Sequence, residues 1–166
     1  MSSPRVAIRP WDHPDGVALR NAQRAEIAER YGTPDSEPGP APTGDDIAVF
    51  LVAYTSEGVA VGCGGLRRLD NSSAEIKRMF VQATARGTGV SVAVIRALEA
   101  EALGRGWSTL KLETGTAQPD AVRFYTREGY EPIPNFGHYV HSEASLCFAK
   151  DLAATVEVAE SVGFAE

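Results

Sequence analysis

The segment from residue 75 to residue 91, EIKRMFVQATARGTGVS, constrains the fold of this chain more than any other. An extended apolar stretch leads into an Arg-Gly-x-Gly turn, and the residues after the turn favour an amphipathic helix. Gly87 and Gly89 let the backbone approach a ligand closely, while the helix start offers unpaired N–H groups and the positive end of its dipole. Arg86 adds a planar cation at the same point. The segment therefore predicts a strand, turn and helix that together bind phosphate.

Apolar periodicity predicts further elements on both sides of this unit. We expect strands at residues 5–9, 47–54, 59–69, 74–81, 107–113, 130–133 and 145–150, and helices at 15–30, 90–104 and from Pro119 to Gly129. Residues 31–46 contain four prolines and three glycines, which predicts a long loop. This order of elements predicts an α/β fold of the α+β type, with a mixed, mostly antiparallel sheet of about six to seven strands flanked by helices.

The length of 166 residues suits one domain, and the sequence contains no internal repeat. We expect one domain over residues 1–166, with residues 151–166 as a short helix or a disordered tail. No stretch approaches the about 18 apolar residues of a membrane span, and the first residues lack the apolar core of a signal peptide, so we expect a cytoplasmic protein without membrane contact. The net charge of −6 argues against nonspecific nucleic-acid binding.

Four residues that often carry chemistry are better explained as structural or surface residues. Cys63 and Cys147 lie in apolar, strand-like stretches without a metal-binding or redox spacing, which predicts buried thiols. His138 and His141 lie three residues apart with no third ligand at a useful spacing, so surface histidines are favoured and no metal is expected.

The glycine turn departs from the two common nucleotide-binding motifs. A phosphate loop of the Walker type needs a Gly-Lys-Ser/Thr end, and a dinucleotide fingerprint needs a glycine where this chain has Val92. Residues 86–91, Arg-Gly-Thr-Gly-Val-Ser, instead resemble the pyrophosphate loop of the GNAT superfamily of N-acetyltransferases, whose pattern is Arg/Gln-x-x-Gly-x-Gly/Ala. Arg86 and Gly89 match fixed positions of this pattern, and Ser91 replaces the usual Gly or Ala.

A second segment is similar to the same family. Residues 118–130, QPDAVRFYTREGY, follow the family pattern Asn-x-x-Ala-x-x-x-Tyr-x-x-x-Gly-Phe/Tyr, with Gln118 in place of the usual Asn. The resemblance covers roughly residues 45–150 and implies the GNAT fold. It also implies that acetyl-CoA is the acyl donor and that the acetyl group passes directly to a primary amine of a small molecule or peptide. Family members often dimerise, so a homodimer is a further expectation.

The resemblance assigns roles to individual residues. Tyr125 is implied as the general acid near the sulfur of the cofactor, with a core aromatic as the alternative. Glu75 is implied as the base that takes a proton from the amine, and a structural carboxylate that bridges strands is the alternative. The backbone N–H groups of Phe80 and Val81 are implied to contact the acyl carbonyl and the pantetheine arm, where family members splay two strands apart. The full set of residues implied to bind acetyl-CoA is Phe80, Val81, Arg86, Gly87, Thr88, Gly89, Val90, Ser91, Gln118 and Tyr125.

Two loops are implied as walls of the acceptor pocket, residues 31–44 and residues 135–139. A noncatalytic acyl-CoA-binding module is the rival function, and the departures at Ser91 and Gln118 are its only support. The presence of Tyr125 and Glu75 favours an enzyme. The sequence does not identify the acceptor.

Overall fold

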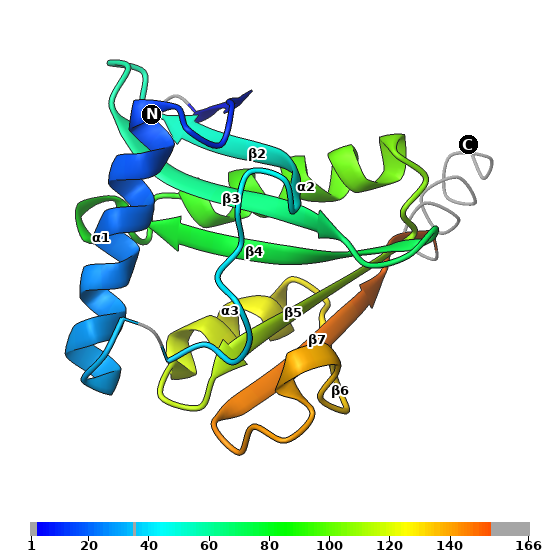
Figure 1. Cartoon of the computed structure of the whole chain (residues 1–166). Coiled ribbons are helices and arrows are strands. Elements are labelled where there is room, and N and C mark those ends of the chain that lie inside the picture. Colours follow the sequence, from blue (N-terminus) through cyan, green and yellow to red (C-terminus); the bar gives the residue numbers. More distant parts are fainter. Residues whose placement is uncertain (1–2, 35, 154–166) are drawn as a thin grey trace.

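One mixed sheet organises the chain in the computed structural model, which describes residues 3–34 and 36–153. Within these residues the sheet has seven strands in the order β1-β2-β3-β4-β5-β7-β6 (Figure 1). The strands are β1 (Arg5–Ile8), β2 (Ile47–Tyr54), β3 (Ala60–Arg68), β4 (Ser73–Val81), β5 (Thr109–Gly115), β6 (Glu131–Ile133) and β7 (Ser145–Asp151). Only β4 and β5 pair in parallel, and the other neighbours are antiparallel. The predicted sheet is therefore confirmed.

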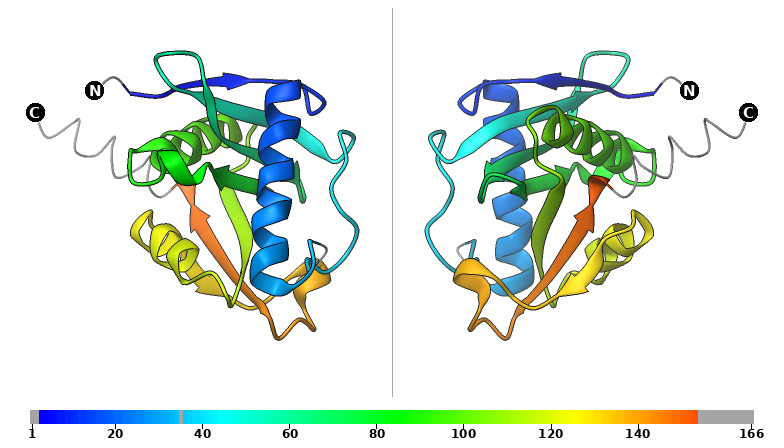
Figure 2. Two further views of the ribbon diagram at one scale, coloured as in Figure 1. Left: turned by 90° about the vertical axis from the view of Figure 1, so that its left-hand side faces the viewer. Right: turned by 90° about the vertical axis from the view of Figure 1, so that its right-hand side faces the viewer.

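The helices cover the two faces of this sheet (Figure 2). On one face α1 (Pro14–Tyr31) buries Leu19 against a cluster that includes Phe50 of β2. On the other face α2 (Val90–Gly104) buries Val94 and Leu98 in a larger cluster, to which Tyr125 of α3 (Pro119–Arg127) also belongs. The described residues also form two short 3-10 turns, η1 (Ala83–Ala85) and η2 (Gly137–Tyr139). Successive strand residues point to opposite faces of the sheet, so the central strands contribute to two separate apolar clusters.

Most predicted boundaries lie within one or two residues of those observed, and the strand expected at residues 107–113 shows the largest shift. It begins at Thr109 and continues to Gly115. The N–H of Trp107 donates to the carbonyl of Ala102 over 2.9 Å, so this residue closes the C-terminus of α2 and does not join the sheet. Its ring is buried in the core all the same. The alternation of apolar residues therefore predicts correctly that Trp107 is buried, but it does not show that the backbone N–H of Trp107 bonds to the end of α2 and not to the sheet.

The parallel pair β4 and β5 separates partway along its length. The two strands pair only from Ser73 to Glu75 on β4, opposite Thr109 to Lys111 on β5. Beyond these residues both strands continue without pairing to each other, which opens a V-shaped split (Figure 1). The splayed strands that the family resemblance implied are therefore present. Val81 and Gly115 lie at the open ends.

A β-bulge lies in β4 beside the split. Lys77 opposes Gly65 of β3 and Phe80 opposes Cys63, so two residues of β4 face a single residue of β3. Arg78 stands in the bulge at a φ of 56°, the left-handed region that residues other than glycine seldom adopt. An extra residue in one strand shifts the alternation of every side chain after it, which matters for the site described below.

The described parts of the proline-rich segment between α1 and β2, residues 32–34 and 36–46, form the predicted loop, which crosses in front of β4 in Figure 1. It is fixed at two points. Glu37 contacts Lys77 and Arg78 of β4, and Gly39 packs against the ring of His138. A loop, and not a helix, thus covers this part of the sheet.

The remaining expectations concern single residues and the C-terminus. Cys63 and Cys147 are buried free thiols, as predicted, and burial raises the pKa of Cys63 to about 12. Within the described residues no helix has the length and apolar character needed to cross a bilayer. Asp151 ends β7 and Leu152 is buried, whereas most of the expected tail, residues 154–166, lies outside the described residues.

Candidate active site

Two adjoining cavities occupy the split between β4 and β5. The larger, about 370 Å³, is lined by six of the residues predicted to bind the cofactor, namely Phe80, Val81, Arg86, Ser91, Gln118 and Tyr125. The smaller, about 160 Å³, contains most of the charged residues of the site, namely Glu37, Glu75, Lys77, Arg78 and Glu113. Met79, Gln118 and Tyr125 line both cavities, so the boundary between them is where two ligands would meet.

The glycine turn has the geometry of an anion site. Gly87 and Gly89 have positive φ angles of 78° and 91°, and a Cβ added at either would meet no atom within 4 Å, so the backbone is open to a ligand. Gly89 is also the N-cap of α2, and no side chain caps the first turn of this helix. The free N–H groups and the helix dipole at this end favour a phosphate group. These residues therefore fit the pyrophosphate of acetyl-CoA.

Arg86 is held beside this turn by contacts on both of its sides. Its Nε donates to the carbonyl oxygen of Val81 over 3.1 Å, and its Nη2 pairs with Glu26 of α1 at 2.7 Å. The guanidinium also lies over the ring of Phe80, 5.8 Å from the centroid. The cation is thereby positioned at the wall of the larger cavity while 43% of its side chain remains exposed to solvent.

Two other predicted cofactor residues direct their side chains elsewhere. The hydroxyl of Thr88 donates to the carbonyl of Ala85 and so stabilises the turn. The side chain of Val90 is buried in the core, where it packs against Gly62 of β3. These two residues could contact a ligand through their backbone, whereas their side chains shape the turn.

Tyr125 lies at the boundary of the two cavities and lines both of them. The residue is 7% exposed, and its ring packs edge-on against Phe124 and Tyr130. Within residues 3–34 and 36–153 the hydroxyl has no hydrogen-bond partner. Burial raises the pKa of this hydroxyl above its ordinary value, so it stays protonated at neutral pH. The ring of Tyr125 thus packs in the core, and the residue also lines both cavities.

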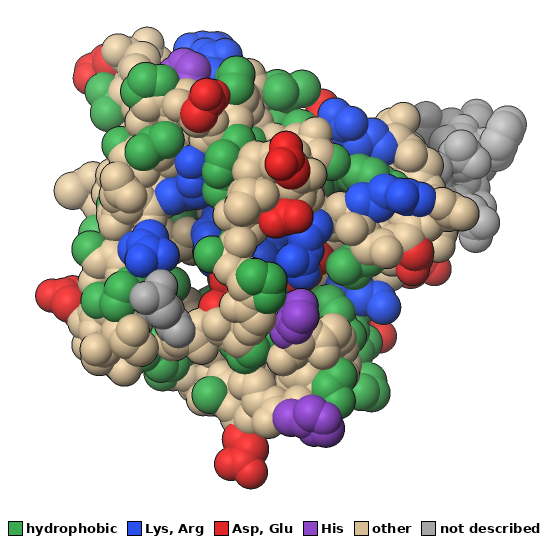
Figure 3. Space-filling model, viewed as in Figure 1, with side chains coloured by type: hydrophobic (Ala, Val, Ile, Leu, Met, Phe, Trp, Pro, Cys, Tyr) green, Lys and Arg blue, Asp and Glu red, His purple; other side chains and the backbone are tan. Residues whose placement is uncertain are grey.

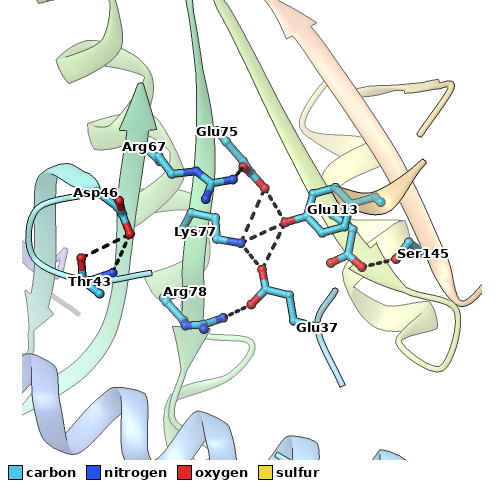
Figure 4. A network of polar contacts seen from close by, with 10 residues as sticks. Glu37, Thr43, Asp46, Arg67, Glu75, Lys77, Arg78, Glu113 and Ser145 are labelled. Atoms are coloured by element: carbon cyan, nitrogen blue, oxygen red, sulfur yellow. Dashed lines mark hydrogen bonds and ion pairs between the residues drawn. The ribbon is translucent and has the colours of Figure 1, made fainter. Parts of the chain in front are cut away.

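Glu75 is fully buried at the centre of a polar network (Figure 4). Its Oε1 accepts a hydrogen bond from Arg67 of β3 at 2.6 Å, and its Oε2 accepts one from the hydroxyl of Tyr139 at 2.7 Å. The ammonium group of Lys77 lies 3.6 Å from the same Oε2. Both oxygens are therefore engaged, and Glu75 does connect strands and a loop as the structural alternative expected.

Glu37 enters this network from the proline-rich loop. Its two carboxylate oxygens contact different cations. Oε1 contacts the ammonium group of Lys77, and Oε2 accepts a hydrogen bond from the guanidinium of Arg78. Burial alone would raise the pKa of Glu37, but the charges of Lys77 and Arg78 outweigh it and hold the pKa below its ordinary value. Tyr139, whose hydroxyl lies 3.1 Å from Glu37 Oε1, has a raised pKa because it is buried beside Glu75 and Glu37.

Glu113 faces the smaller cavity from β5, on the opposite side of the split. Its one hydrogen bond in the described part of the chain comes from the hydroxyl of Ser145, which donates to Oε2 over 2.6 Å and leaves Oε1 unengaged. Burial raises the pKa of Glu113, and the nearby carboxylates of Glu37 and Glu75 act in the same direction. A carboxylate with a raised pKa and an unengaged oxygen is suited to accept a proton.

The structure brings six of the residues predicted to bind the cofactor together in the larger cavity, whereas several residues of the smaller cavity were not predicted individually. Glu37 and Tyr139 belong to the two loops expected to wall the acceptor pocket, residues 31–44 and 135–139, and both line the smaller cavity, but neither residue was singled out and Glu113 was not expected there. Glu113 alternates with Leu110 and Leu112 in β5, so the period-two pattern could have placed it on the face opposite the core. His138 and His141 are exposed, and among the described residues no three His, Cys, Asp or Glu side chains form a group that could hold a metal ion.

The sequence of the chain is similar to that of one family of known proteins. The family model described as Acetyltransferase (GNAT) family matches residues 16–130. The IAA acetyltransferase of Azospirillum brasilense is 39% identical over 104 residues, which are 62% of this chain and 67% of that protein.

Solved structures share the fold. A Klebsiella pneumoniae protein provisionally assigned as an acyl-CoA N-acyltransferase superposes with a TM-score of 0.77 at 29% identity, covering 90% of this chain and 97% of that one. A GNAT family acetyltransferase of Elizabethkingia anophelis, solved with acetyl-CoA bound, superposes with a TM-score of 0.67 at 14% identity, covering 92% of this chain and all of that one (100%).

Proposed function

The chain belongs to the GNAT family of acetyltransferases, and we propose that its two adjoining cavities bind acetyl-CoA and a primary amine on either side of Tyr125. Family membership makes the chain an N-acetyltransferase that uses acetyl-CoA, in preference to the noncatalytic module considered from the sequence. The observation that carries the assignment of the cavities is the position of Tyr125, which lines both of them. The acceptor is a small molecule or a peptide.

Acetyl-CoA supplies a thioester whose carbonyl carbon can accept an amine. The turn from Arg86 to Ser91 would hold its pyrophosphate through backbone N–H groups and the guanidinium of Arg86. The pantetheine arm and the acyl carbonyl would lie along Phe80 and Val81, on the part of β4 that does not pair with β5. Backbone N–H groups directed at the carbonyl oxygen would stabilise the negative charge that develops there.

The amine needs help to lose its proton. An alkyl amine with a pKa of about 10.4 costs roughly 4 to 5 kcal/mol to deprotonate at pH 7. Glu75, the base expected from the sequence, lines the acceptor cavity, but its oxygens already accept from Arg67 and Tyr139. Glu113 is the second candidate, and it is favoured by its unengaged Oε1 and its raised pKa. We assign the proton-accepting role to Glu113 and a supporting role to Glu75.

Tyr125 would return a proton to the departing thiolate. The demand on it is modest, because a thiolate with a pKa near 8.5 leaves readily. The raised pKa of Tyr125 keeps the proton on the hydroxyl until it is needed. No acyl-enzyme is required, since the two cavities bring the amine and the thioester together directly.

Isothermal titration of the purified chain with acetyl-CoA tests the cofactor assignment. We expect saturable binding that Arg86→Gln weakens, while Arg105→Gln, at the far end of α2, leaves it unchanged. An absence of saturable binding by the parent protein would overturn the proposal. Homodimer formation stays a prediction, which sedimentation velocity of the same preparation checks.

A further inference from the structure

The acceptor cavity contains two cations that converge on one carboxylate. Lys77 Nζ pairs with Oε1 of Glu37, and Arg78 Nη1 donates to Oε2 of the same group over 2.6 Å (Figure 4). The two cationic side chains are 5% and 19% exposed, so water screens them little. A carboxylate held at one oxygen by a lysine and at the other by an arginine is the geometry of a carboxylate-binding subsite.

The bulge in β4 creates this convergence. In a regular strand Lys77 and Arg78 would point to opposite faces of the sheet, because successive side chains alternate. The extra residue at Arg78 breaks the alternation, and both side chains reach the same loop carboxylate. Arg78 holds a φ of 56° to do so, a conformation that is costly for arginine and is found preferentially at functional sites.

The charges of the cluster call for an anion at this position. Arg67, Lys77 and Arg78 supply three positive charges that pair with the carboxylates of Glu75 and Glu37, whereas the Glu113 carboxylate in the same cavity contacts no cation within the described residues. Glu75 is fixed within β4 and is already shared between Arg67 and Lys77. Glu37 comes from a loop, so its side chain can rotate away without breaking sheet pairing. A second carboxylate must then replace it, because buried cations without a partner are costly.

From this geometry we propose that Lys77 and Arg78 bind a carboxylate of the acceptor, in the position that the Glu37 carboxylate takes in this structure. The acceptor is then a compound of the amino-acid class, with both a primary amine and a carboxylate. The inference rests on the proposed function, because the amine must face Glu113 and Tyr125, which line the same cavity as the two cations. Both functional groups of the acceptor would have their partners within one cavity.

The size and surroundings of the cavity agree with a small acceptor that carries a carboxylate. Its volume of about 160 Å³ is below the roughly 300 Å³ of common ligand pockets, and Glu37 itself forms part of the wall. A hollow of about 280 Å³ adjoins it between α1 and the loop, lined by Arg24, Glu37 and Arg78 among others. Figure 3 shows Lys and Arg side chains gathered around this hollow. Positive charge at the approach favours the arrival of an anion.

Acetyl transfer to matched amines tests the inference. For each of several amino acids, the free acid, its primary amide and its decarboxylated amine are assayed with saturating acetyl-CoA. We expect kcat/KM for the acid to exceed that for the other two by about 10-fold or more, the effect of a hydrogen bond between charged groups. The amine of the amide loses its proton more easily than that of the acid, which biases this comparison against the proposal.

Variants at the subsite separate recognition from folding. Arg78→Asn tolerates the positive φ and should raise KM for the acid by about 10- to 100-fold while leaving the amide unaffected. Arg78→Lys should restore part of the preference, Glu37→Gln should lower KM for the acid, and Arg105→Asn serves as the matched control at an exposed guanidinium.

The outcomes are distinct. Equal use of acid, amide and decarboxylated amine by the parent protein would overturn the inference, as would equal losses on acid and amide in Arg78→Asn. Acetyl-CoA binding without transfer to any acid would also overturn it and leave the cofactor site intact. A lack of acetyl-CoA binding would instead refute the proposed function.

Discussion

Replacing Glu113 by Gln removes the carboxylate that we assign as base and keeps the shape of its side chain. The amide oxygen of Gln can still accept the hydrogen bond from the Ser145 hydroxyl, which spans 2.6 Å in the parent. At pH 7 the variant can use only the small neutral fraction of the amine, and forming the neutral amine costs roughly 4 to 5 kcal/mol. General bases recover part of such a cost, commonly about 10²- to 10⁴-fold in rate. We expect kcat to fall at least about 100-fold.

The pH dependence of kcat identifies the cause of this fall. Because the pKa of Glu113 is raised, the parent should lose activity as pH falls through a value above the ordinary 4.3 or so of a glutamate. Above that value its kcat should be nearly constant. In Glu113→Gln the kcat should instead rise about tenfold per pH unit toward the pKa of the amine, because solution then supplies the neutral form. The two profiles should converge above about pH 9.

Thermal unfolding separates this effect from damage to the fold. A raised folded-state pKa means that Glu113 contributes stability only in its protonated form, below its unfolded-state pKa, and that this contribution is lost as pH rises through the folded-state value. At pH 7 the buried charge is therefore a cost, and Glu113→Gln should have a Tm equal to or above the parent's. Glu75→Gln should unfold more easily, because breaking a buried pair costs about 3 to 5 kcal/mol.

A kcat of Glu113→Gln within about threefold of the parent at pH 7 would refute this assignment, given the 10²-fold minimum of general base catalysis. If Glu75→Gln were folded and showed the pH-dependent recovery instead, the base would be Glu75, as the sequence suggested. A fall in both variants without recovery at high pH would assign both carboxylates to acceptor binding.

Three further substitutions test other parts of the site and the core. Tyr125→Phe should lower kcat by about 10-fold or more with acetyl-CoA affinity within about twofold, and unchanged turnover would remove Tyr125 from the acid role. Arg86→Gln should raise the Kd for acetyl-CoA by about 10-fold by calorimetry, with unchanged Kd arguing against pyrophosphate contact. Leu98→Ala, at a fully buried position in α2, should lower the free energy of unfolding by about 2 to 5 kcal/mol, and a denaturant titration with no change would contradict the packing.

Within the predicted cofactor site, the turn from Arg86 to Ser91 could be recognised from local sequence because its residues follow one another in the chain. This turn owes its conformation to its own glycines and to the helix start after them, so local sequence suffices to predict a phosphate-binding turn, and the family resemblance then implied acetyl-CoA. Tyr125 was named through the family resemblance of residues 118–130. The predicted ends of strands that are flanked by turn residues were also correct. For example, β2 begins at Ile47 and ends at Tyr54, as predicted.

The acceptor half depends on contacts between distant segments. Glu37 and Lys77 are 40 residues apart and Glu113 and Ser145 are 32 apart, and neither pair has a local pattern that predicts contact. The point where β4 and β5 cease to pair cannot be read from either strand, because both strands continue beyond it. The positive φ of Arg78 is also hidden, since arginine gives no preference for that region.

The bulge at Arg78 links the two halves of the site. It places Lys77 and Arg78 toward the loop carboxylate, and it sends Phe80 to the same face of the sheet, in the cluster with Phe50 and Leu19 beside α1. Deletion of one residue at the bulge would restore strict alternation and exchange the faces of the residues on one side of it, because the side-chain period of a strand is two. Arg78 would then leave the acceptor cavity, or Phe80 would leave the cofactor cavity. A single irregularity in β4 thus lets one strand contribute to both cavities.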